Sequence, residues 1–218
     1  MKKLIIWDFD GVIADTEHMW VTTRLDILNQ KLNLGWSLAQ AEKYMGGKSD
    51  KDKSASLKEA GVFVDESFWK EAMEKDFAKM SKGLPMTKGV EDIFKLTQFD
   101  QCIATGGIYA KTKVKLEKSG AEKYFSEKHV FTVDLVKHGK PSPDLFLLAA
   151  KTMGYTPENC FVIEDSVVGI TAAKKAKMIP IAYIEHDSEQ TIAEIKNMKI
   201  KNVFTNMAQL KSFLLKQL

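Results

Sequence analysis

The sequence predicts an α/β fold, a doubly wound parallel sheet with an α-helical segment inserted after its first strand. Three observations support this fold class. Short apolar runs recur along the chain and end at glycine or acidic residues, as buried parallel strands do. Helical periodicity fills the intervals between these runs, and strand–helix alternation is typical of parallel sheets. One interval differs from the others, because residues 17–80 carry helical signals almost throughout.

Length and composition fit a globular protein. The 218 residues suffice for one large domain or for a core with a smaller insert. Hydrophobic residues make up 44% and charged residues 28%, which argues against disorder. No apolar run approaches the roughly 20 residues that span a bilayer, and the first run meets Asp8 too soon for a secretory signal. Cys102 and Cys160 fall inside apolar runs, so we expect buried free thiols in a cytoplasmic, membrane-free protein, with a monomer as the default.

Charge is nearly balanced along the chain. The formal net charge is +3, from 32 basic and 29 acidic residues, and the basic residues are spread over the whole sequence. The densest cluster consists of four lysines of one predicted helix, Lys111, Lys113, Lys115 and Lys118. Glu117 interrupts this cluster, a pattern that predicts a solvated helix face. We therefore expect no nucleic-acid partner.

The first strand is predicted at residues 4–7 and is followed by two acids. Asp8 and Asp10 stand at its carboxyl end, and Gly11 turns the chain. Alternation places both carboxylates on one side, where like charges repel unless a cation lies between them. Mg²⁺ is the simplest cation for such an all-oxygen site.

The insert begins with a long amphipathic helix. Val21, Leu25, Leu28 and Leu32 share one face at helical spacing, and Arg24 is expected elsewhere around the cylinder. Three shorter helices are predicted after it, at residues 37–44, 51–60 and 66–80. The last of them carries an apolar stripe that we expect to pack into a core, made of Trp69, Met73 and Phe77.

The second half of the chain alternates between strands and helices. Four further strands are predicted, at residues 101–104, 130–133, 160–163 and 180–184. Helices are predicted at residues 90–97, 108–119 and 145–153, and around Ala172. Residues 1–15 and 86–218 are therefore expected to form the α/β core, and residues 16–85 the inserted helical domain.

Side chains that can bind a phosphoryl group or a cation follow three of the predicted strands and lie in one loop. Thr105 ends the second strand, the pair Glu164 and Asp165 ends the fourth, and Lys140 lies in a loop between them. In doubly wound sheets, ligands bind at the carboxyl ends of the strands, where the strand order reverses. Acids, a hydroxyl and a lysine at one edge suit a phosphoryl group held beside Mg²⁺. The N–H groups of Gly106 and Gly107 precede a helix, which is a natural phosphate site.

The sequence resembles the haloacid dehalogenase-like (HAD) phosphatase superfamily, in the branch with a helical cap after the first strand. Four motifs carry this resemblance in the family's order: Asp8-Phe9-Asp10-Gly11-Val12, Thr105, Gly139-Lys140-Pro141 and Glu164-Asp165-Ser166. Any one of these motifs is weak, but the ordered set is specific. The resemblance covers essentially the whole chain and implies the fold that the pattern predicts.

The resemblance also implies roles for these residues. Asp8 would be the nucleophile that becomes an aspartyl phosphate, and Asp10 would protonate the leaving alcohol and then activate water. Thr105 and Lys140 would hold the phosphoryl oxygens. The ligands of Mg²⁺ would be Asp8, the backbone carbonyl of Asp10 and Asp165, with Glu164 left open as a further ligand.

Two reactions of this family remain open. Dehalogenases lack the second aspartate, so Asp10 favours phosphoryl transfer. β-Phosphoglucomutase, which moves a phosphoryl group between sugar hydroxyls, resembles this chain in Asp15-Thr16 and in the Glu164-Asp165 pair. Its early cap-helix histidine is replaced here by Trp20, a departure that favours a phosphatase.

The turn after the second insert helix is expected to select the substrate. The resemblance matches Gly46, and Lys48 is the near candidate for the cap arginine that grips a distal phosphate, although the aligned position is close to Ser49. Tyr44 and Met45 belong to the same turn. We expect a small phosphorylated metabolite, a sugar phosphate or a phospho-acid, as the substrate.

Two other protein classes share some of these features. A signalling receiver domain also carries a phosphorylatable aspartate, a lysine and an acidic metal site on a doubly wound sheet. In a receiver that aspartate follows a middle strand and no helical insert is present, whereas here the candidate follows the first strand. A catalytically silent binding protein would be expected to lack one of the acids or Lys140, and none is missing.

Overall fold

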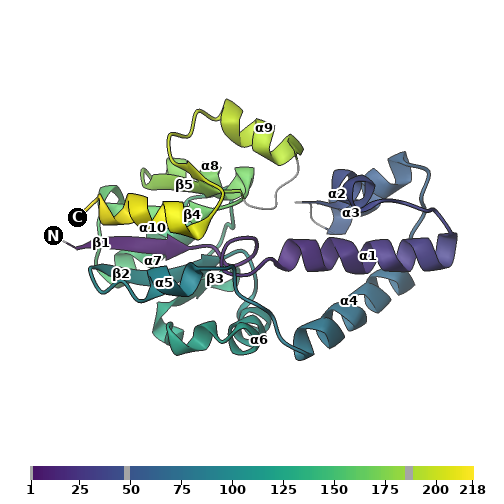
Figure 1. The fold of residues 1–218 in the computed structure, drawn as a ribbon, viewed down its shortest axis with the longest axis horizontal. Coiled ribbons are helices and arrows are strands. Elements are labelled where there is room, and N and C mark those ends of the chain that lie inside the picture. The colour runs from purple at the N-terminus through teal and green to yellow at the C-terminus, as the bar shows by residue number, and fades with distance from the viewer. Residues whose placement is uncertain (1, 47–49, 185–188) are drawn as a thin grey trace.

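The structure is a computed structural model and describes residues 2–46, 50–184 and 189–218. Within these ranges the strands form one parallel sheet in the order β3-β2-β1-β4-β5-β6 (Figure 1). The strands are β1 (Lys3–Trp7), β2 (Phe99–Thr105), β3 (Val130–Thr132), β4 (Cys160–Glu164), β5 (Ile179–Tyr183) and β6 (Val203–Phe204). This is the doubly wound order, so the predicted fold class is confirmed.

Ten α-helices are described in the same ranges. The first four of them follow β1 directly in the chain: α1 (Thr16–Leu32), α2 (Leu38–Met45), α3 (Asp50–Glu59) and α4 (Glu66–Ser81). The other six are α5 (Val90–Phe94), α6 (Tyr109–Ser119), α7 (Asp144–Met153), α8 (Val167–Lys175), α9 (Glu189–Asn197) and α10 (Met207–Leu215). Short 3-10 helices lie at Ala121–Lys123, Glu127–His129, Val133–Leu135 and Pro157–Asn159. None of the described helices is long and apolar enough to cross a membrane.

The central strand β1 is apolar on both faces because helices cover both. Ile5 and Trp7 pack with α5 and α10 on one face of the sheet, and Leu4 and Ile6 pack with α7 and α8 on the other (Figure 1). These side chains are fully buried, which explains why β1 reads as a continuous apolar run. Cys102 and Cys160 are buried free thiols in the second of these layers, as predicted.

The strand order reverses next to β1, and this places the site. β1 pairs with β2 on one side and with β4 on the other, with Trp7 opposite both Ile103 and Ile163. The residues that follow these three strands therefore emerge at the same edge of the sheet. Helices α1–α4 lie beyond this edge, and both chain termini lie at the opposite end of the molecule (Figure 1).

The insert has its own core and its own buried ion pair. Val21, Leu28 and Met45 are among the buried residues of this cluster. Arg24 of α1 and Asp76 of α4 form an ion pair at 2.8 Å, and both side chains are buried. The prediction that Arg24 lies away from the packed face is therefore wrong.

The predicted apolar stripe on α4 is confirmed for Trp69, which packs against the insert core, but is wrong for the other two residues. Met73 is 56% exposed and Phe77 is 59% exposed. The buried face of the helix is instead formed by Phe68, Ala72, Asp76 and Met80. Asp76 on this face pairs with Arg24, so the buried face of α4 includes a charged residue that a search for apolar periodicity does not find. Leu32 is likewise exposed at the end of α1.

The predicted strands agree with the structure to within two residues at each end. The helix predicted at residues 90–97 is shorter, because α5 ends at Phe94. The predictions stop at residue 184, and the structure adds α9, β6 and α10 beyond it. Helix α10 completes the cover of one sheet face with Met207, Leu210 and Leu214.

Candidate active site

Asp8 is the first residue beyond β1. Its N–H donates to the carbonyl of Ile163 at 2.9 Å, so the backbone pairing with β4 continues past the end of the strand. The residue is 5% exposed and follows four fully buried apolar residues. The rigid central strand therefore positions the Asp8 carboxylate.

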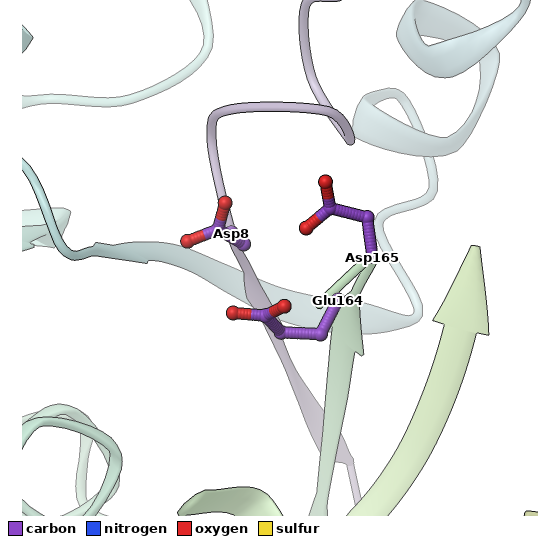
Figure 2. Close-up of side chains that lie close together, drawn as sticks. All are labelled: Asp8, Glu164 and Asp165. Carbon is purple, nitrogen blue, oxygen red and sulfur yellow. The ribbon is translucent and has the colours of Figure 1, made fainter. Parts of the chain in front are cut away.

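Three carboxylates meet at the ends of β1 and β4. Oxygen atoms of Asp8, Glu164 and Asp165 all lie within 4.8 Å of one another. Figure 2 shows the three side chains converging from these two adjacent strand ends. A compact set of carboxylate oxygens is the donor type that Mg²⁺ and Ca²⁺ prefer. The cluster therefore fits a divalent cation.

Lys140 joins two of these acids. Its Nζ atom donates to Asp8 Oδ1 at 2.5 Å and to Glu164 Oε1 at 2.6 Å. The lysine side chain is 8% exposed and lies over the ring of Phe146 at 4.9 Å from the centroid. Asp8, Glu164 and Lys140 are called the Asp8 centre below.

The Asp8 centre has an excess of negative charge. Burial raises the pKa of Asp8 to about 7, since the favourable charge of Lys140 is partly offset by the carboxylates of Glu164 and Asp10. Burial also disfavours the charged form of Lys140, but Asp8 and Glu164 outweigh it and raise the pKa of Lys140, which stays protonated. One lysine cannot neutralise two carboxylates, so a bound cation would relieve the remaining repulsion.

Hydrogen bonds from Ser166 and two closely packed glycines surround the other two acids of the cluster. Glu164 Oε2 accepts the N–H and the hydroxyl of Ser166, both at 2.8 Å. Gly169 packs against this carboxylate so closely that a Cβ atom there would lie 1.7 Å from Glu164 Oε1. Gly11 has φ +77° and a Cβ atom at its position would lie 1.9 Å from Asp165 Oδ2. A side chain at either position would therefore displace the neighbouring carboxylate.

Asp10 lies outside this three-acid cluster and has a lysine of its own. Lys115 Nζ donates to both Asp10 Oδ1 and Asp10 Oδ2 at 2.6 Å. The hydroxyl of Thr16 also donates to Oδ1. Asp10, Thr16 and Lys115 are called the Asp10 centre below. The Asp8 and Asp10 carboxylates thus each have a lysine of their own, Lys140 and Lys115.

The prediction that Lys115 belongs to a solvated helix face is wrong. The residue is 7% exposed, whereas Lys111, Lys113 and Lys118 of the same helix are exposed. Lys115 shares the buried face of α6 with Thr112 and Leu116. That i, i+3, i+4 spacing is a signal that sequence reasoning missed, since a buried lysine at such a position requires a nearby acid.

Thr105 closes β2 beside the site. The residue is 1% exposed, and its hydroxyl oxygen accepts the N–H of Gly107 at 3.1 Å. A hydroxyl group can accept one hydrogen bond and donate another. Helix α6 begins at Tyr109, whose N–H donates to Asp134 Oδ1 at 3.2 Å. The predicted phosphate donors Gly106 and Gly107 therefore precede the helix, and the N–H of Gly107 already has an acceptor.

The cap turn is described only in part. Gly46 is the C-cap of α2, and its N–H donates to the Glu42 carbonyl at 2.7 Å. Met45, which belongs to the turn that we expect to select the substrate, is fully buried in the insert core. Tyr44 stacks on Trp36 at 5.1 Å between ring centroids. The predicted Lys48, together with Gly47 and Ser49, lies outside the described residues.

Fold and site together define a class of protein. It is a doubly wound α/β protein with an acidic, cation-type site at the carboxyl edge of the sheet, beside an inserted helical segment. The family model of the haloacid dehalogenase-like hydrolases matches residues 5–183. The chain belongs to this family, as the resemblance implied.

Similar proteins of this family include named phosphatases. The phosphorylated carbohydrates phosphatase of Thermotoga maritima is 28% identical over 190 residues, which cover 84% of this chain and 86% of the relative. The (DL)-glycerol-3-phosphatase 2 of Arabidopsis thaliana is 31% identical over 187 residues, which cover 80% and 76%. A HAD family hydrolase from Deinococcus radiodurans, solved with bound phosphate and sodium, has a TM-score of 0.87 at 23% identity over 99% of this chain and 96% of that chain. At this identity the structural likeness shows the fold.

Proposed function

We propose that this chain is a Mg²⁺-dependent phosphatase that hydrolyses a small phosphorylated metabolite through an aspartyl-phosphate intermediate. The observation that carries the proposal is the Asp8 centre, in which a buried carboxylate lies against Lys140 and beside two further acids. We assign residues 1–15 and 86–218 to the catalytic core and residues 16–85 to a cap that covers the substrate. The names of the relatives support the reaction class.

In the first step, a carboxylate oxygen of Asp8 attacks phosphorus and the bond from phosphorus to the leaving oxygen breaks. Asp10 donates a proton to that oxygen, and the alcohol departs. Lys140 and the Thr105 hydroxyl contact the phosphoryl oxygens and stabilise their charge. Bound beside Asp8 and Asp165, Mg²⁺ would reduce the repulsion between the carboxylate and the anionic substrate.

In the second step, water attacks phosphorus of the aspartyl phosphate. Asp10, now ionised, takes the proton from this water. Inorganic phosphate leaves and the Asp8 carboxylate is restored, so the enzyme returns to its starting state. The same side chain thus serves as acid and then as base.

We assign the substrate class as sugar phosphates or related phospho-acids. The names of the two relatives, one for phosphorylated carbohydrates and one for glycerol 3-phosphate, support this class. Phosphoryl transfer between two hydroxyls of one sugar is the second candidate, and Asp15-Thr16 and the Glu164-Asp165 pair favour it. In that reaction a sugar hydroxyl takes the place of water in the second step.

The test is phosphate release with Mg²⁺, first from 4-nitrophenyl phosphate and then from a panel of phosphorylated metabolites. We expect Asp8→Asn to lower turnover by on the order of 10⁴-fold or more, because the nucleophile is lost. Asp92→Asn, which replaces an exposed aspartate of α5, is the matched control and should keep full activity. Retained turnover in Asp8→Asn would overturn the assignment of the nucleophile. Conversion of β-glucose 1-phosphate to glucose 6-phosphate without phosphate release would favour the mutase.

A further inference from the structure

We propose that Lys115 is a positioning residue that orients the Asp10 carboxylate for proton transfer. The proposal rests on the proposed function, in which Asp10 moves the proton. It assigns a role to a side chain of α6, which lies outside the four sequence motifs. In the described structure the ammonium group of Lys115 contacts Asp10, and neither Asp8 nor Glu164.

The contact between Lys115 and Asp10 is unusually complete. The Nζ atom lies 2.6 Å from both carboxylate oxygens, so it contacts the two oxygens equally. The lysine side chain is 9% exposed, whereas the Asp10 side chain is 33% exposed. The lysine side chain is therefore enclosed by protein, whereas part of the Asp10 carboxylate remains accessible to solvent and substrate. A buried ammonium without a partner would be strongly unfavourable, so α6 can bury Lys115 only because Asp10 faces it.

Two further groups restrict the same side chains. The hydroxyl of Thr16, the first residue of α1, donates to Asp10 Oδ1. The Lys115 ammonium also lies over two aromatic rings, at 5.7 Å from the centroid of Phe9 and 5.9 Å from that of Trp20. Cation–π contacts of this kind restrain the direction in which the ammonium points. Asp10 is thus held between α6 of the core and α1 of the insert.

The two lysines of the site bind different acids. Lys140 binds Asp8 and Glu164, and Lys115 binds Asp10. A group that transfers a proton must lie within about 2.6–3.2 Å of the oxygen it serves, and a misplacement of about 1 Å can cost on the order of 100-fold in rate. Without Lys115, this carboxylate, which is one-third exposed, would be held by the Thr16 hydroxyl alone. Lys115 therefore supplies the orientation that Asp10 lacks by itself.

The test exploits the leaving group. Wild type, Lys115→Met and Lys115→Arg are compared by kcat/KM with Mg²⁺ on 4-nitrophenyl phosphate, whose phenol leaves without a proton, and on phenyl phosphate, whose phenol has a pKa of about 10 and needs one. We expect Lys115→Met to lose roughly 10- to 100-fold on phenyl phosphate and less than about 3-fold on 4-nitrophenyl phosphate. Arginine retains a charged donor and should restore part of the loss. Lys113→Met on the exposed face of α6 is the matched control and should resemble wild type.

A double-mutant cycle then tests whether Lys115 acts through Asp10. Asp10→Asn should show the same dependence on the leaving group, and adding Lys115→Met to it should cause no further loss on phenyl phosphate. Equal losses on both substrates, or additive losses in the double variant, would overturn the proposal. Should Lys115→Met fail to fold, as judged by circular dichroism, Lys115→Gln takes its place in every comparison. A wild type without activity on either substrate would instead refute the proposed function.

Discussion

The Asp8 centre and the Asp10 centre are built from the same parts but differ in access. In each, a buried lysine donates to a carboxylate at 2.5 or 2.6 Å, and the two lysine side chains are 8% and 9% exposed. Their acids differ, because the Asp8 side chain is 8% exposed and that of Asp10 is 33% exposed. Lys140 also serves two acids, whereas Lys115 serves one. The Asp8 centre is closed, and the Asp10 centre is open on one side.

This difference fits the two proposed roles. A nucleophile needs a fixed position and protection from competing water, which a closed centre provides. A proton carrier has to meet the leaving oxygen and later a water molecule, so part of its carboxylate must stay accessible. The difference in access also gives the comparison measurable consequences.

Among the variants that compare the two centres, Lys140→Met should have the largest effect. We expect turnover of 4-nitrophenyl phosphate to fall by about 10²- to 10³-fold, because charge on the phosphoryl oxygens loses its stabilising cation. The variant should also be less stable by about 3–5 kcal/mol, since two buried carboxylates are left without their partner. Urea unfolding and steady-state kinetics measure both quantities. Lys115→Met is the contrasting variant, because water can reach the partly exposed Asp10 carboxylate. An equal loss of stability in both variants would remove the distinction between a closed and an open centre.

Gly169→Ala should disturb the Asp8 centre alone. Helix propensity by itself favours alanine by about 1 kcal/mol, so a neutral site would become more stable. Here the new Cβ atom would overlap Glu164 Oε1 at 1.7 Å and displace the carboxylate from Lys140. We expect turnover to fall roughly 10- to 100-fold, without dependence on the leaving group. Val168→Ala, at an exposed neighbour on the same helix, is the control. Unchanged activity in Gly169→Ala would show that the position of Glu164 is unimportant.

Metal binding should also report on the Asp8 centre. A cation that binds only the folded state at 100 times its Kd stabilises it by about 2.7 kcal/mol, which corresponds to a rise in Tm of about 5 to 10 °C for a chain of this size. We expect this rise on addition of Mg²⁺ to protein stripped with EDTA. Asp165→Asn should reduce the rise strongly, and Lys115→Met should keep it. If Lys115→Met abolished the rise in Tm and Asp165→Asn kept it, the cation would instead bind at the Asp10 centre.

Much of the Asp8 centre could be predicted from the sequence. Asp8 follows an apolar run, the pair Glu164 and Asp165 ends another, and parallel strands bring such ends together. Lys140 lies in a glycine- and proline-containing loop, where a charged residue is expected to be accessible to a ligand. Local pattern and topology therefore suffice when each residue stands at the end of its element.

The Asp10 centre could not be predicted in the same way. Lys115 lies in the middle of a helix among three exposed lysines, and its partner is 105 residues away in the chain. A charged residue is usually solvated, so only a contact across the fold reveals that this one is buried. Asp76 misled the reading of α4 for the same reason, since its partner Arg24 belongs to another helix. Buried charges are decided by tertiary pairing, which periodicity does not report.

The pH dependence of stability without metal should report on the charge balance of the Asp8 centre. Burial raises the pKa of Asp8 to about 7 from its ordinary value of 3.8. The folded protein therefore binds this proton more tightly than the unfolded chain, and the stability that it contributes is fully present below the unfolded pKa and is lost as the pH rises through about 7. Urea unfolding in EDTA from about pH 5 to about pH 8 measures this change. The unfolding free energy of wild type minus that of Asp8→Asn should fall as the pH rises from about 5 to about 8, because asparagine does not titrate. A difference that rises instead would mean that Lys140 outweighs burial at Asp8, and the two centres would then differ in access but not in charge balance.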